Sequence, residues 1–133
     1  MPAPVVVDSS GWIEVFTNGA QADHFLTLLA DDTSLVVPAI SLFEVFKWVL
    51  REHGEAQAVQ AAAVMQRGQV VDLDDRLALA AAQLSHALQL PMAGSIILAT
   101  ARDHQARLHT MDSDFRGLAD VQWIDPAGAA PTA

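Results

Sequence analysis

Five short runs of mostly apolar residues, with helical segments between the first four of them, constrain the fold of this chain more than any other feature. The runs are PVVVD (4–8), SLVVP (34–38), QVVDL (69–73), RLHTMD (107–112) and VQWI (121–124). Continuous apolar runs are typical of strands buried on both faces, and strands that alternate with helices form parallel sheets. The sequence therefore predicts an α/β fold with a central, mostly parallel five-stranded sheet and helices on both faces.

The segments between these runs carry helix signals. We expect a short helix that begins after a cap at Ser9 or Ser10, and then helices over residues 20–30, 40–52, 55–67, 76–88 and onward from Pro91. No repeat or linker divides the chain. We therefore predict a single domain over residues 1–125, followed by a flexible tail over residues 126–133.

Composition narrows the class of protein. Hydrophobic residues make up 52% of the 133 residues, which is enough for one packed core, and the absence of cysteine excludes disulfides and thiolate metal sites. The most apolar segment, ISLFEVFKWVL, is interrupted by Glu44 and Lys47 and is too short to span a bilayer. The first residues lack the pattern of a signal peptide. We expect a cytoplasmic protein that does not enter a membrane.

The charge balance is strongly acidic. Sixteen acidic residues oppose seven basic ones, which gives a formal net charge of -9. A protein that binds nucleic acid by simple electrostatics has the opposite balance. Three explanations stay open: the partner is not a nucleic acid, the partner is a basic protein, or metal ions invert the local field at the binding site.

Three acidic residues from distant segments are expected at one edge of the sheet. Asp8 ends the first run, Asp112 ends the fourth, and Glu44 lies one turn inside the helix after the second. Ligands of parallel sheets bind beyond the carboxyl ends of the strands. Carboxylates that converge there raise each other's pKa unless a cation lies between them, and ligation by oxygen alone suits Mg²⁺ or Mn²⁺. Such a site can activate water and neutralise a phosphodiester.

Each acid also has a purely structural interpretation. Asp8, Asp112 and Asp114 occupy positions where turns favour aspartate, and Glu44 is spaced to pair with Lys47 on its helix. The five histidines show no metal-ligand spacing. We interpret the aromatic residues Trp12, Phe43, Phe46 and Trp48 as core or subunit interface rather than as base-stacking surfaces.

Three segments together resemble a known family. VVVDSSGWIEVF, VPAISLFEVFKW and LPMAGSIILATARDHQARLHTMDSDF are similar to the PIN domain, and in particular to VapC toxins of toxin–antitoxin pairs. The resemblance implies an α/β endoribonuclease that depends on Mg²⁺ or Mn²⁺, forms a homodimer and is inhibited by a VapB antitoxin. It implies RNA as the substrate, with tRNA as one candidate. On this basis the catalytic residues are Asp8, Glu44, Asp112 and Asp114, the first three also metal ligands, with Ser9 and Thr110 accessory.

One position departs from the family. The family pattern resembles LPxADALIAATA, and the matching segment here reads LPMAGSIILATA, so Gly94 stands where the family has a metal-site aspartate. Losing an interaction made in the transition state costs on the order of 10²-fold or more in rate. We therefore expect impaired or absent activity. A change made or selected during cloning and a natural, degenerate binding module both explain the glycine.

The flanking cations and two other enzyme classes complete the predictions. Lys47, Arg51 and Arg116 are close to the acids in sequence and would contact RNA phosphates. A phosphoacceptor domain of the response-regulator type is disfavoured, because it needs a lysine on a late strand and the only lysine is Lys47. A DxDxT phosphatase is disfavoured, because Ser9 and Ser10 follow Asp8.

Overall fold

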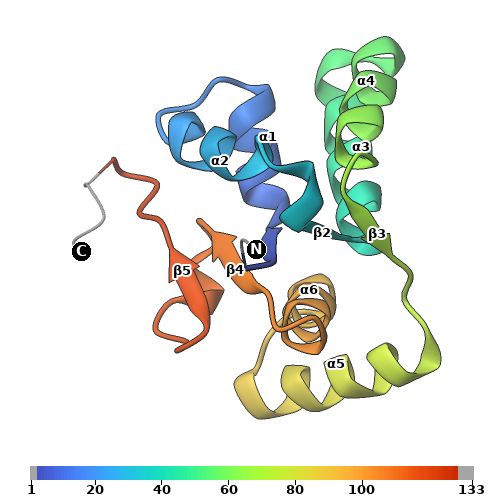
Figure 1. Cartoon of the computed structure of the whole chain (residues 1–133), viewed down its shortest axis with the longest axis vertical. Coiled ribbons are helices and arrows are strands. Elements are labelled where there is room, and N and C mark those ends of the chain that lie inside the picture. The colour runs from blue at the N-terminus through green and yellow to red at the C-terminus, as the bar shows by residue number, and fades with distance from the viewer. Residues whose placement is uncertain (1–2, 129–133) are drawn as a thin grey trace.

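The computed structural model describes residues 3–128, which form one five-stranded sheet in the order β3-β2-β1-β4-β5. All four neighbouring strand pairs are parallel. The strands are β1 (Val5–Val7), β2 (Leu35–Pro38), β3 (Gln69–Val71), β4 (Arg107–Thr110) and β5 (Val121–Trp123). The predicted five-stranded parallel sheet is thus confirmed (Figure 1).

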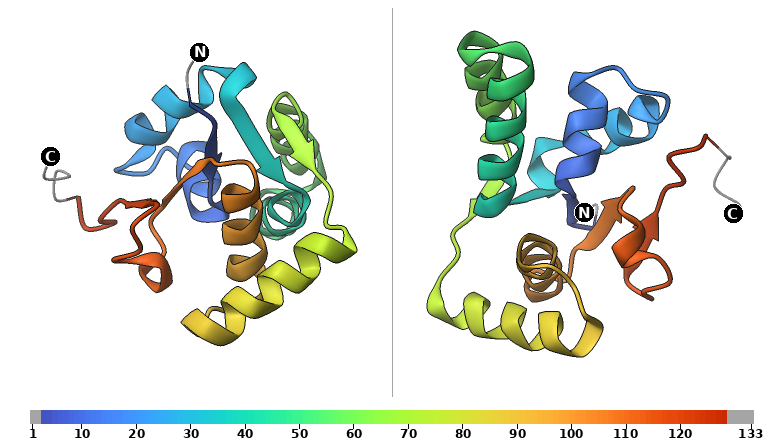
Figure 2. Two further views of the ribbon diagram at one scale, coloured as in Figure 1. Left: turned by 60° about the horizontal axis from the view of Figure 1, so that its bottom comes forward. Right: turned by 180° about the vertical axis from the view of Figure 1, so that it is seen from behind.

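Helices cover both faces of the sheet, as predicted (Figure 2). One face carries α1 (Ser9–Phe16), α2 (Ala22–Leu29), α3 (Ala39–His53) and α4 (Glu55–Met65), and the other carries α5 (Asp75–Leu88) and α6 (Met92–Asp103). Two short 3-10 helices, η1 (Asp32–Ser34) and η2 (Ser113–Phe115), precede β2 and follow β4. Of the predicted flexible tail, residues 129–133 lie outside the described part of the chain.

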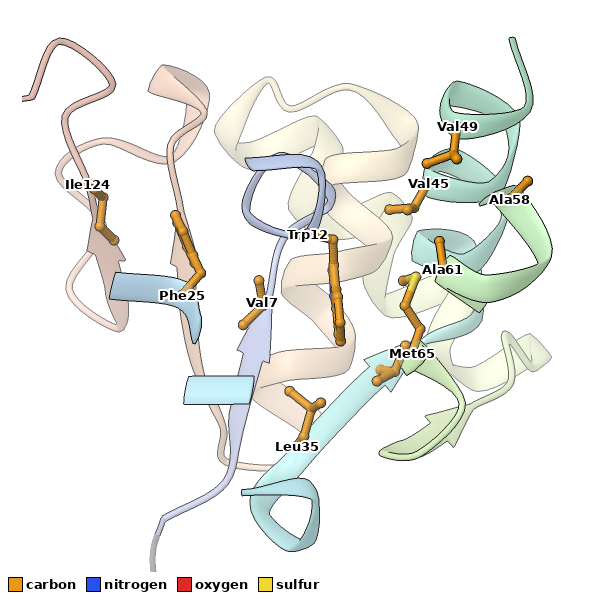
Figure 3. Close-up of a cluster of buried hydrophobic side chains, with 11 residues drawn as sticks. Val7, Trp12, Phe25, Leu35, Val45, Val49, Ala58, Ala61, Met65 and Ile124 are labelled. Atoms are coloured by element: carbon orange, nitrogen blue, oxygen red, sulfur yellow. The ribbon is translucent and has the colours of Figure 1, made fainter. Parts of the chain in front are cut away.

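The sheet divides the hydrophobic core into two layers because successive strand residues point to opposite faces. Val7 packs with Trp12, Phe25 and Met65 beneath α1–α4, and its neighbour Val6 packs on the other side with residues of α6. Figure 3 shows Trp12 between Val7 and Met65. Burial on both faces is the physical reason for the continuous apolar runs in the sequence.

One detail differs from the sequence-based expectations. The first helix begins directly after Asp8, which occupies the N-cap position, so neither Ser9 nor Ser10 is the cap. Both serines are instead used for hydrogen bonds to carboxylates, which are described below. Of the aromatic residues predicted to lie in the core or in a subunit interface, Trp12 is buried in the core and Phe43, at 61% exposure, lies on the surface.

Within residues 3–128, no single helix is long and apolar enough to cross a membrane; α5 and α6 reach that length only together, as a pair bent by 115°.

Candidate active site

Asp8 lies at the carboxyl end of the central strand β1, where it is held by two hydroxyl groups. Its backbone N–H donates to the carbonyl oxygen of His109 (3.0 Å), which extends the pairing of β1 with β4. Ser10 Oγ and Thr110 Oγ1 both donate to its Oδ2, at 2.9 and 2.8 Å. The side chain is only 6% exposed, and this burial raises the pKa of Asp8 despite these bonds, with a further contribution from the charge of Asp112.

Thr110 connects Asp8 to the loop after β4. Its Oγ1 accepts a hydrogen bond from the backbone N–H of Asp112 (2.9 Å) while it donates to Asp8. Asp112 Oδ1 in turn accepts from the backbone N–H of Asp114 (2.9 Å) and caps η2. Asp114 itself is exposed. The order of the strands therefore brings Asp8 and Asp112, which are far apart in sequence, to the same edge of the sheet.

Glu44 approaches the same edge from α3. Ser9 Oγ donates to its Oε1 at 2.7 Å, and the side chain is half-buried. Burial raises the pKa of Glu44, and the charges of Asp8 and Asp112 raise it further, although the bond from Ser9 lowers it. The three carboxylates are thus close enough to influence one another. The helical pair with Lys47 that we considered does not form, because the Lys47 amine lies over the Phe43 ring at 5.7 Å.

Gly94 lies in the first turn of α6 and is buried against an aromatic ring. A Cβ atom at this position would lie 3.0 Å from Cζ of Phe115, and the next two ring atoms would be at 3.7 and 3.8 Å. Phe115 is 1% exposed and packs with the core residues on the α6 side of the sheet. The tip of the ring therefore has to move by a few tenths of an ångström to admit any side chain at position 94.

Ser10 is a site residue that the sequence analysis missed. Its Oγ donates to Asp8 and accepts from the backbone N–H of Met111 (3.2 Å), so it joins the start of α1 to the loop after β4. The available signal was a hydroxyl two residues after a strand-end acid. Its role depends on the adjacent strand, which the local sequence does not reveal.

The predicted phosphate-contacting cations have different environments. Arg51 is exposed and its Nε lies 3.7 Å from Glu52 Oε1. The Arg116 guanidinium lies over the Trp123 ring, 4.7 Å from its centroid. Neither side chain forms an ion pair with Asp8, Glu44 or Asp112 in the described part of the chain.

The donor atoms suit a hard divalent cation by their chemistry. Asp8, Glu44 and Asp112 offer only carboxylate oxygens, and no lysine or arginine contributes to the pKa shift of Asp8 or Glu44. The three carboxylates are spaced more widely than in a formed metal site, because no three His, Asp or Glu side chains among residues 3–128 lie close enough together to hold a metal ion. Asp8, Glu44 and Asp112 are the residues that would hold such a cation.

A histidine pair lies on the α2 side of β4. His24 Nε2 and His109 Nδ1 are 3.3 Å apart, so one ring nitrogen donates a hydrogen bond to the other. Burial and the nearby His24 lower the pKa of His109 to about 4, and burial lowers that of His24. Both rings are therefore neutral at pH 7, and their hydrogen bond joins α2 to β4.

Comparison with known proteins identifies the family. The PIN domain family matches residues 5–121, so the chain belongs to the PIN domain family. No curated protein sequence matches it. Solved structures with the same fold include a Klebsiella pneumoniae toxin–antitoxin complex, with 24% identity, a TM-score of 0.74 and coverage of 92% of this chain and 97% of that one.

Two further structures share the fold. Mycobacterium tuberculosis VapC20, described as a toxin that cleaves the sarcin–ricin loop, has 18% identity and a TM-score of 0.72, with 86% of this chain and 95% of that chain covered. A DNA-bound VapBC complex from Salmonella typhimurium has 14% identity and a TM-score of 0.71, with 94% and 99% covered. These similarities concern the fold of the whole domain, from β1 to β5.

Proposed function

We propose that this chain is the toxin component of a VapBC-type toxin–antitoxin pair and an endoribonuclease that depends on Mg²⁺ or Mn²⁺, with activity impaired or lost because Gly94 replaces a metal-site aspartate. The observation that carries the proposal is the meeting of Asp8, Glu44 and Asp112 at the carboxyl edge of the sheet. Membership of the PIN family supports it, as do structural neighbours that are described as toxins.

The residues of the chain have distinct tasks in this mechanism. Ser10 and Thr110 fix one oxygen of Asp8, which sets the direction of the carboxylate. A divalent cation bound by Asp8, Glu44 and Asp112 would supply neutralisation of the scissile phosphodiester. Ser9 donates to Oε1 of Glu44 and in this way orients the third carboxylate.

The expected partners can be assigned to two surfaces of the chain. An exposed, mostly apolar groove of about 450 Å³ lies between α3 and α4. Its lining residues are Leu42, Phe43, Phe46, Lys47, Leu50, Ala62 and Gln66. We assign this groove to a VapB-type antitoxin or to the partner subunit of a homodimer, and RNA to the acidic edge, in the cytoplasm where RNA substrates such as tRNA are available.

The test is cleavage of RNA by the protein as it stands and by Gly94→Asp, with Mg²⁺, with Mn²⁺ and with a chelator. Gly94→Asn is the matched control, because it adds a side chain of the same shape without the charge. We expect metal-dependent cleavage that is at least about 10²-fold faster in Gly94→Asp than in Gly94→Asn. The proposal fails if Gly94→Asp, incubated with total cellular RNA and either metal, cleaves none of it, and if expression of this variant does not slow growth.

A non-catalytic module that binds only an antitoxin is the second candidate. The contact between Gly94 and Phe115 favours it, because the ring occupies part of the space that an aspartate needs. Co-purification of a small basic partner with both the protein and Gly94→Asp, and no cleavage by either, would identify this function.

A further inference from the structure

The seven basic side chains of this acidic chain divide into two groups. Four arginines pair with carboxylates: Arg51 with Glu52, Arg67 with Asp32, Arg76 with Asp103 and Arg102 with Asp120. Arg107 reaches the side-chain oxygen of Gln122. Among the described residues, only Lys47 and Arg116 have no oxygen partner from the protein, and each lies over an aromatic ring. Both belong to segments that carry site acids.

The register of the sheet places Trp123 beside Thr110, the residue that donates a hydrogen bond to Asp8. Trp123 is opposite Thr110 in the parallel pairing of β4 with β5, so the two side chains lie on the same face of adjacent strands. Neighbouring strands are about 4.8 Å apart. Thr110 donates to Asp8, and the exposed Arg116 covers the Trp123 ring at 4.7 Å. The guanidinium therefore lies at the edge of the acidic site, over the outer strand.

The pairing with Trp123 is notable because carboxylates are near in sequence. Asp114 and Asp112 precede Arg116 by two and four residues, and the cation pairs with neither. A cation–π contact at an exposed site is comparable in strength to an exposed salt bridge. The ring can therefore hold the guanidinium away from the acids, which leaves its N–H donors to bind an incoming anion.

The choice of tryptophan points the same way. Its Nε1 is buried and has no hydrogen-bond partner among the described residues. A buried donor without an acceptor destabilises the folded protein, so stability alone favours phenylalanine at this position. What tryptophan adds is a larger ring face, and the guanidinium occupies that face.

We propose that Arg116 binds a phosphate of single-stranded RNA next to the scissile bond, and that Trp123 is the positioning residue that keeps Arg116 free for it. The inference rests on the proposed nuclease function and assigns its substrate a path over β5. A guanidinium binds phosphate through two parallel N–H···O bonds, which fixes orientation as well as charge. In a chain of net charge -9, such a contact gives the RNA one local point of electrostatic attraction.

The test measures the affinity of a labelled single-stranded RNA by fluorescence anisotropy over a series of NaCl concentrations, in Mg²⁺ and in chelator, with gels to confirm that the RNA stays intact. Arg116→Gln should weaken binding about tenfold and make the slope of log K against log salt shallower by about 0.7. Arg107→Gln is the matched control, because it removes the same charge at the opposite end of β4. It should leave the slope unchanged.

Trp123 is tested by two substitutions. Trp123→Leu should weaken RNA binding as much as Arg116→Gln does, and the double variant should be no weaker than either. Trp123→Phe keeps a ring and should restore most of the affinity. A merely structural role would not give this ranking together with the altered salt slope, and thermal unfolding of each variant verifies that it is folded.

The outcomes separate this inference from the proposed function. If the unchanged protein binds no RNA in either buffer, RNA is not its substrate and both proposals fail. If it binds RNA and Arg116→Gln keeps the original affinity and slope, the Arg116 inference fails while the nuclease stands. If Arg116→Gln instead releases a co-purifying protein and leaves RNA binding intact, the surface is a protein interface and the inference is overturned.

Discussion

Restoring a side chain at position 94 tests the structure of the site independently of catalysis. Gly94→Ala removes the glycine from the first turn of α6, which favours the folded state by about 0.5–1 kcal/mol. The new methyl group would lie 3.0 Å from the tip of the Phe115 ring, and the other ring contacts are at ordinary distances. Overpacking of a core costs about 1–3 kcal/mol, and a single close atom belongs at the low end. We expect the two effects to cancel to within about 0.5 kcal/mol.

Gly94→Asp adds a carboxylate that, in the proposed site, lies near the three others. Asp8 and Glu44 already have raised pKa values, partly because of neighbouring acids, so a fourth carboxylate should destabilise the protein further in chelator. Divalent cation should reverse this order, because an ion at 100 times its Kd stabilises the folded state by about 2.7 kcal/mol. Gly94→Asn should respond to the cation no more than Gly94→Ala does.

Urea unfolding followed by tryptophan fluorescence, with Mn²⁺ or chelator, measures these free energies. A destabilisation of Gly94→Ala by more than about 1.5 kcal/mol would show that the Phe115 ring cannot move. If Mn²⁺ stabilises Gly94→Asp no more than Gly94→Asn, then position 94 does not face the cation site and the account of the missing carboxylate is refuted.

Three further predictions concern the surroundings of the site. Thr110→Val removes a hydrogen bond from the buried Asp8, so it should raise the pKa of Asp8 further and destabilise the protein by about 1–3 kcal/mol at neutral pH, as measured by urea unfolding. Thr110→Ser should restore most of the loss, and equal effects of Val and Ser would contradict the hydrogen bond from Thr110 to Asp8. Because the pKa of His109 is lowered to about 4, its neutral form contributes stability above pH 6.5 that is lost toward pH 4. This histidine alone should therefore lower the free energy of unfolding by about 2 kcal/mol between pH 7 and pH 5, and a His109→Phe protein with the same pH profile would refute this. Asp74→Ala should cost about 1 kcal/mol by removing the cap of α5, whereas Asp74→Asn should be nearly neutral in thermal unfolding.

Much of the architecture was predictable because burial on both faces leaves a mark on the inner strands. Val6 and Val7 are both apolar since each faces a different layer of helices, and all four residues of β2 are buried, whereas the edge strand β3 is exposed at Gln69 and Val70. The acids Asp8 and Asp112 could be placed because the carboxyl ends of parallel strands share an edge. The boundaries were less accurate, as the capping of α1 by Asp8 rather than by a serine shows.

The remaining features depend on contacts between segments that sequence periodicity does not encode. Trp123 faces Thr110 only because β5 pairs in one register with β4, and a shift of one residue would turn the ring to the other face. The cost of the glycine at position 94 depends on the ring of Phe115, 21 positions away. Neither the order of strands nor the direction of a side chain follows from composition or spacing alone.

The net charge of -9 does not exclude a polyanionic substrate once the position of each charge is known. Four arginines are paired with acids, whereas Lys47 and Arg116 have no carboxylate partner within residues 3–128. RNA affinity should therefore respond to added NaCl and to added Mg²⁺ in opposite directions. NaCl should weaken binding by competing at phosphates, and Mg²⁺ at constant ionic strength should strengthen it by neutralising Asp8, Glu44 and Asp112. Asp8→Asn should weaken the response to Mg²⁺ but keep the response to NaCl, and the same fall in affinity with both salts would show that the carboxylates take no part in RNA binding.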